Sequence, residues 1–182
     1  MNVEVTRVQP TIAKRETQRY AGIRKVLRRE EVPEVVPDCL ATAFEFLQKH
    51  RVQVIGAPLI RYFMVDYNTG RIEIDVGVPV GVTLPADPRV HSAQIPAGTF
   101  ATVIHQGPYD ALVETTAALM DWAKQNKVIW MMAEQHKVTR WDGRVEHYIV
   151  GPPDEPNPKY WQTEIAILIS NATPLTRRSK SR

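Results

Sequence analysis

Hydrophobic and polar positions alternate in some stretches of the chain and recur every three or four residues in others. Alternation is typical of a strand with one buried face, and the longer spacing is typical of an amphipathic helix. Helical spacing predicts a helix of about 14 residues beginning near Pro37 and another beginning near Asp110. Alternation predicts strands at residues 3–8, 20–27, 59–65, 71–78, 91–95, 100–105, 144–150 and 161–169.

The order strand, helix, strand, strand occurs twice. The first copy covers about residues 1–80 and the second about residues 90–170, with a proline-rich connection between them. We therefore predict an α+β fold of two repeats related by a pseudo-twofold axis, with antiparallel sheets, helices on one face and a ligand cleft on the other. We expect a single domain over residues 1–176, because 182 residues bury one core well and are too few for two.

The strand predicted at residues 161–169 carries a carboxylate near its middle. Alternation places Ile165 on the core face and Glu164 on the opposite face, beside small and apolar neighbours. Ionisation of a carboxyl group there is unfavourable unless a cation or a hydrogen-bond donor approaches it. Glu164 therefore predicts a site for a cationic or polar ligand, and the alternative is a structural ion pair with an arginine such as Arg61 or Arg144.

Further acidic and aromatic side chains are predicted to line the same cleft. Overlaying the repeats matches Glu73 with Glu164, and we expect these two carboxylates to superpose. The alternatives are cross-strand packing for the tyrosines, a solvated face for Glu73 and Asp75, and loop packing for the tryptophans. The predicted lining consists of Tyr62, Glu73, Glu146, Tyr148 and Glu164, with Trp130 and Trp141 from an aperiodic segment that overhangs the opening.

Seven short motifs follow one another over nearly the whole chain. They are Gly56-Ala-Pro58, Arg61-Tyr62, Val76-Gly-Val-Pro-Val80, Ile95-Pro-Ala-Gly98, His105-Gln-Gly-Pro-Tyr109, Glu146-His-Tyr148 and Trp161-Gln-Thr-Glu164. With this order and spacing the chain resembles the GyrI-like small-molecule-binding domain. That family includes effector-binding halves of multidrug-responsive transcription activators, gyrase-inhibitory proteins, and standalone members similar to hydrolases of cyclopropane-containing toxins.

The resemblance implies a ligand cleft between the repeats and a central acidic residue that attracts cationic aromatic compounds. Glu164 occupies the place of that residue, and Glu146 and Tyr148 match the Glu-x-Tyr strand that lines the family's cleft. The implied function is binding of a hydrophobic, aromatic or cationic small molecule by an effector-binding or sequestering protein linked to transcription regulation. The alternative is a cofactor-independent hydrolase of small toxic compounds such as cyclopropanoids, in which Glu164 activates water or stabilises positive charge and Tyr148 aids proton transfer or orientation.

One departure from the family's regulators concerns DNA. They carry a helix-turn-helix domain ahead of this one, and residues 1–32 are too short and too strand-like to form it. We therefore expect no direct DNA binding, and a separate regulator or a second copy in a homodimer as a partner besides the ligand.

Charge and cysteine content add little to this picture. The net charge of +3 arises in residues 177–182, because residues 1–176 hold 19 basic and 20 acidic side chains. We predict a disordered basic tail there.

The lone Cys39 permits no intramolecular disulfide, and no apolar run approaches membrane-spanning length. These features predict a cytoplasmic protein, and the family resemblance adds that it is bacterial. The five scattered histidines have no metal-binding spacing, so we expect no metal or cofactor.

Overall fold

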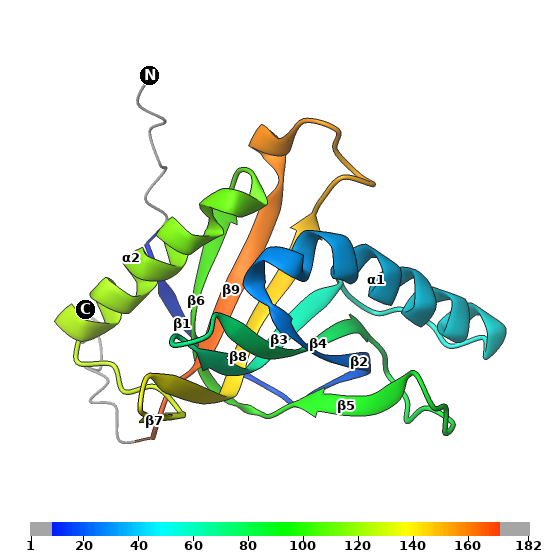
Figure 1. Cartoon of the computed structure of the whole chain (residues 1–182), viewed down its shortest axis with the longest axis horizontal. Coiled ribbons are helices and arrows are strands. Elements are labelled where there is room, and N and C mark those ends of the chain that lie inside the picture. Colours follow the sequence, from blue (N-terminus) through cyan, green and yellow to red (C-terminus); the bar gives the residue numbers. More distant parts are fainter. Residues whose placement is uncertain (1–8, 172–182) are drawn as a thin grey trace, which may run out of the picture.

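The computed structural model describes residues 9–171 (Figure 1). The strand predicted at residues 3–8 and the predicted basic tail at 177–182 lie outside the described residues. The helices are α1 (Val32–Lys49) and α2 (Leu112–Gln125), with short 3-10 helices η1 (Arg29–Glu31), η2 (Tyr109–Ala111) and η3 (Pro158–Tyr160). The strands are β1 (Thr11–Arg15), β2 (Gln18–Arg28), β3 (Leu59–Asp66), β4 (Arg71–Pro79), β5 (His91–Ile95), β6 (Gly98–Gln106), β7 (Met132–Gln135), β8 (Val138–Val150) and β9 (Gln162–Leu168).

The strand order shows how the two repeats join. Within the described residues the strands form one curled antiparallel sheet in the order β1-β6-β9-β8-β3-β4-β2-β5, with β7 pairing to β8. Strand β3 of the first repeat pairs with β8 of the second, so the repeats lie edge to edge. The outer strands are exchanged, because β1 pairs with β6 and β5 pairs with β2. The predicted α+β fold of two strand-helix-hairpin repeats is confirmed.

Both helices pack on the same face of the sheet, which we call the helix face. Helix α1 packs on β2 and β4, and α2 packs on β6, so β9, β8 and β3 lie between them (Figure 1). The main core forms here and includes Phe46, Leu119 and Ile165. A smaller core containing Tyr20 and Phe100 forms on the opposite face, which we call the far face. Neither helix in the described part of the chain is long and apolar enough to cross a membrane.

Helix α1 begins earlier than predicted. It starts at Val32, with Pro33 in its first turn and Pro37 inside the helix. Pro37 lies beyond the first turn, so its missing N–H leaves the carbonyl of Pro33 without the usual intrahelical hydrogen bond. The predicted apolar stripe is also shifted, because Phe46 is buried whereas Phe44 is exposed.

The pairing of strands defines which residues of the two repeats correspond. Each repeat has an isolated β-bridge just after its last strand. Val80, after β4, pairs with Val54, which follows α1, and Ile169, after β9, pairs with Trp130, which follows α2. Val80 and Ile169 lie five positions beyond Asp75 and Glu164, respectively. Asp75 is therefore the counterpart of Glu164, and the predicted match with Glu73 is wrong. Alternation alone could not choose, since residues 73 and 75 are both acidic and share a face.

Candidate functional site

The sheet divides the predicted site residues between its two faces. Glu146 pairs with Ile165, which is fully buried in the core under the helices. Glu164 adjoins Ile165 in β9 and therefore points to the far face. The prediction that all these residues line one cleft is wrong. Tyr62, Trp141, Glu146 and Tyr148 lie on the helix face, and Glu73 and Glu164 lie on the far face.

Glu164 on the far face is held by Arg15 and approached by His147. Arg15 donates two hydrogen bonds to it, with distances of 2.9 Å from Nη1 and 2.5 Å from Nη2. Nδ1 of His147 lies 3.2 Å from Oε2, although without the alignment of a hydrogen bond. Burial alone would raise the pKa of Glu164, but His147 and Arg15 together lower it to about 2. Glu164 is therefore ionised and already paired.

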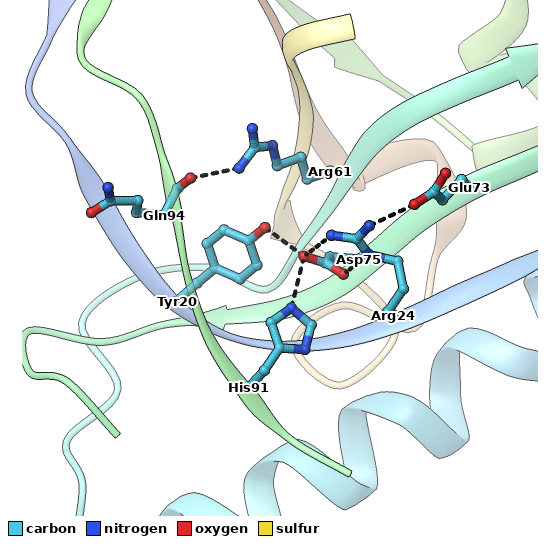
Figure 2. Close-up of polar contacts among 7 residues, drawn as sticks. All are labelled: Tyr20, Arg24, Arg61, Glu73, Asp75, His91 and Gln94. Atoms are coloured by element: carbon cyan, nitrogen blue, oxygen red, sulfur yellow. Dashed lines mark hydrogen bonds and ion pairs between the residues drawn. The ribbon is translucent and has the colours of Figure 1, made fainter. Parts of the chain in front are cut away.

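Asp75 is surrounded by donors in the same way (Figure 2). This fully buried carboxylate accepts hydrogen bonds from the Tyr20 hydroxyl at 2.7 Å and from Nε of Arg24 at 2.6 Å, and Nε2 of His91 lies 3.1 Å away. Arg24 also donates to Glu73 at 2.6 Å. Burial opposes ionisation, yet the donors lower the pKa of Asp75 below its ordinary value. The alternative that Asp75 lies on a solvated face is wrong, because residues of β2 and β5 cover this carboxylate.

These two carboxylates join the exchanged strands to the rest of the sheet. Arg15 ends β1 and binds Glu164, while His91 begins β5 and contacts Asp75. Arg61 of β3 adds a further link to β5 through the carbonyl of Gln94 at 2.5 Å (Figure 2). Glu164 and Asp75 thus each contact a residue of an exchanged strand.

The far face is also hollowed beside Glu164. A cavity of about 610 Å³ is lined in part by Arg15, His147 and Glu164. Arg15 and His147 each contact Glu164, so a cation that enters the cavity would compete with them for the carboxylate.

Glu146 on the helix face has different surroundings. It is 5% exposed, and its Oε2 accepts hydrogen bonds from the hydroxyls of Tyr62 at 3.1 Å and Tyr148 at 2.9 Å. Within residues 9–171, no Lys, Arg or His nitrogen lies within 4.0 Å of this carboxylate, and Oε1 has no hydrogen-bond partner. Burial and the adjacent carboxylate raise the pKa of both tyrosines well above the ordinary value, so their hydroxyls stay protonated and donate.

Aromatic side chains continue from Tyr148 toward one end of this group. The Tyr109 ring of η2 meets the Tyr148 ring edge to face at 5.2 Å, and it lies 4.5 Å from the Trp161 ring. The sequence prediction missed Tyr109 and Trp161 as site residues. Both belong to motifs that carry the family resemblance, which is the signal that could have identified them.

A cavity opens on the helix face between α2 and the β7–β8 hairpin. Its volume is about 390 Å³, within the range typical of small-molecule sites. The segment predicted to be an aperiodic overhang is this hairpin. Trp141 lines this cavity, which is not the cleft around Glu164 that the sequence predicted, and Trp130 packs against the core. The lining includes Arg29, Thr116, Met120, Met132, Trp141 and Arg144.

Arg144, which the sequence prediction considered only as an ion-pair partner of Glu164, lines this cavity and also contacts the Glu146 group. Its guanidinium carbon lies 4.7 Å from the centre of the Tyr62 ring and 5.3 Å from that of Trp141. The sequence could have indicated that Arg144 lies beside Glu146, because residues two positions apart in a strand have their side chains on the same face.

The fold defines a class, the small α+β domains built from two related strand-helix-hairpin repeats. A family model for the GyrI-like small molecule binding domain matches residues 9–170, and the chain belongs to this family. This confirms the resemblance seen in the sequence. Comparison with curated protein sequences gives no match.

Solved structures share the fold at low sequence identity. The EcmrR C-terminal domain is 19% identical with a TM-score of 0.74, over 91% of this chain and 99% of that chain. SAV2435 bound to tetraphenylphosphonium is 10% identical with a TM-score of 0.55, over 90% and 94%. A hydrolase encoded by lin2189 from Listeria innocua is 11% identical with a TM-score of 0.56, over 92% and 94%.

Proposed function

We propose that this domain binds an aromatic or apolar cation on the helix face, with the Glu146 carboxylate facing the ligand's positive charge. The observation that carries this proposal is the state of Glu146, which is buried, hydrogen-bonded by neutral phenols and free of cationic partners among the described residues. A buried carboxylate without a counter-charge is unfavourable, and a bound cation supplies that charge.

The aromatic side chains beside Glu146 support the same ligand class. Tyr148, Tyr109 and Trp161 present ring surfaces that favour flat apolar groups and attract cations through their faces. SAV2435, which has the same fold, binds tetraphenylphosphonium, a cation without a hydrogen-bond donor. Such a ligand is recognised by charge and aromatic contact, and the Glu146 group offers both. A ligand-binding role for Glu164 stays a prediction, which the titrations below compare with that of Glu146.

The biological role that we propose is effector sensing or sequestration linked to transcription regulation. The support is the similarity to the EcmrR C-terminal domain. The match with the present chain extends over 99% of that domain. A separate regulator or a second copy of the chain remains the partner that we expect for signalling.

A second candidate function is cofactor-independent hydrolysis, in which Glu146 would take the role first expected of Glu164. The hydrogen bond between the Tyr148 hydroxyl and the Glu146 carboxylate favours it, since a positioned carboxylate can activate water. The raised pKa of Tyr148 argues against proton donation by this phenol at neutral pH. Binding is therefore the leading proposal.

The test is calorimetric titration with tetraphenylphosphonium and with triphenylmethanol, a neutral molecule of similar shape. We expect the cation to bind at least about tenfold more tightly, which corresponds to about 1.4 kcal/mol. Equal affinities would contradict the role of Glu146. Mass spectrometry of a panel that includes cyclopropane-containing compounds, after incubation with the protein, separates the two candidates, because binding leaves each compound intact and hydrolysis yields a product.

A further inference from the structure

Two N–H donors that line the cavity between α2 and the β7–β8 hairpin lack acceptors. Arg144 is 4% exposed, and its Nε atom has no hydrogen-bond partner among residues 9–171. Trp141 is 6% exposed, and its Nε1 atom also has none in that part of the chain. Buried N–H groups are normally paired, so these two donors, which belong to residues of the cavity lining, are unused.

The charge of this lining is positive. Arg144 and Arg29 each contribute a guanidinium group, and Glu134, which is exposed on β7, contributes one carboxylate. Within residues 9–171, no carboxylate oxygen lies within 4.0 Å of a side-chain nitrogen of either arginine. A buried arginine is ordinarily paired with an acid, and Arg144 is not.

Stacking on aromatic rings accounts for only part of the Arg144 environment. The rings of Tyr62 and Trp141 stabilise the guanidinium through its faces. Its N–H groups project from the edges, however, and edge donors need acceptors. The rings therefore position the guanidinium and leave its edge available.

We propose that this cavity binds the carboxylate group of an amphipathic ligand through Arg144 and the Trp141 indole, with Arg29 contributing attraction. A carboxylate has two oxygens in the geometry that the paired N–H groups of a guanidinium match. Met120 and Met132 give the lining flexible apolar surface for the body of such a ligand.

This inference rests on the proposed function and deepens it by naming a second charged group on the ligand. Arg144 and Glu146 lie two residues apart on one face of β8, so their Cα atoms are about 7 Å apart. A small zwitterionic molecule spans that distance. Its cationic group would face Glu146, and its carboxylate would lie in the cavity beside Arg144.

The probes for this subsite are 1-naphthaleneacetate and its neutral analogue 1-naphthaleneacetamide, titrated separately by calorimetry. We expect the wild-type protein to bind the carboxylate at least about tenfold more tightly than the amide, because only the carboxylate pairs with the guanidinium. Equal affinities, or binding of neither probe, would overturn the proposal. This comparison requires no substitution and therefore does not depend on the folding of a variant.

Substitutions at Arg144 test whether this residue causes the preference for the carboxylate over the amide. Arg144→Met should abolish it, and Arg144→Lys should retain part of it because the charge remains while the two-pronged geometry is lost. Arg140→Met is the matched control, since Arg140 is exposed on the same strand and lines neither cavity. A full preference in both Arg144 variants would exclude Arg144 as the binding residue.

Failure of this inference and failure of the proposed function give different results. Loss of the carboxylate preference with intact tetraphenylphosphonium binding would remove the anionic subsite and leave the Glu146 site. A retained carboxylate preference without cation binding would support the subsite and overturn the proposed role of Glu146.

Discussion

Glu146 and Glu164 lie on neighbouring strands and differ in what surrounds their carboxylates. Glu164 on the far face is bonded to Arg15 and approached by His147. Among the residues that the structure describes, Glu146 on the helix face is bonded only to the hydroxyls of Tyr62 and Tyr148. An ion pair satisfies a buried charge within the protein, and neutral donors leave the charge without a counter-ion. A buried acid is therefore a candidate ligand site only when no cationic side chain of the protein pairs with its carboxylate.

The counterpart of Glu164 in the other repeat strengthens this comparison. Asp75 is also surrounded by cationic and phenolic donors, and it too contacts a residue of an exchanged strand. The far face thus uses its acids to hold the sheet together, while the helix face keeps Glu146 unpaired. Substitutions on the far face should change stability, and substitutions on the helix face should change binding.

The largest effect is expected for Asp75→Ala. This change leaves the buried Tyr20 hydroxyl and Arg24 without their acceptor, so the free energy of unfolding should fall by about 3–5 kcal/mol. Urea denaturation measures it. Glu73→Ala is the matched control because Glu73 pairs with the same arginine at a more exposed position, and its cost should stay below about 1 kcal/mol. Similar costs for the two variants would contradict a structural role for Asp75.

A smaller loss of stability, on the order of 2 kcal/mol at neutral pH, is expected for Glu164→Gln. The pKa of Glu164 is lowered from 4.5 to about 2, so its ion pairs contribute stability above pH 4.5 and lose it as the pH falls toward 2. The difference in unfolding free energy between wild type and variant should therefore shrink over that range. A difference that is independent of pH would show that the charge of Glu164 is not what stabilises the fold.

The smallest effect concerns the aromatic group beside Glu146. Tyr109→Leu removes the ring that contacts Tyr148 and Trp161, and it should weaken tetraphenylphosphonium binding about fivefold, or about 1 kcal/mol. Calorimetry measures this change, with Tyr160→Leu as the control because Tyr160 is half exposed on η3. An unchanged affinity in the Tyr109 variant would place the ligand elsewhere.

The fold was predictable from the sequence because both repeats carry clear periodicity, and the motifs gave the family. The site was less predictable because alternation defines two faces within a strand and says nothing about how neighbouring strands pair. The sequence correctly placed Ile165 in the core, but only the pairing of β8 with β9 shows that Glu146 shares its face. The shift in pairing register between Tyr62 and Met64 likewise could not be inferred from the pattern.

Ion pairs that depend on the exchanged strands could not be predicted from the sequence either. Arg15 lies 149 residues from Glu164, and the pairing of β1 with the second repeat is what brings them together. The sequence predicted a strand at residues 3–8 and did not identify β1 at all. Arg61 and Arg144 were therefore considered as partners of Glu164, and neither is the one that the structure contains.

The central claim, that Glu146 is the acid that binds the ligand, is tested most directly by titrating tetraphenylphosphonium into wild type, Glu146→Gln and Glu164→Gln. Each substitution removes one negative charge and preserves the shape of the side chain. We predict at least about tenfold weaker binding for Glu146→Gln and a change of less than about twofold for Glu164→Gln. Weakened binding in Glu164→Gln together with unchanged binding in Glu146→Gln would contradict the account and place the ligand on the far face.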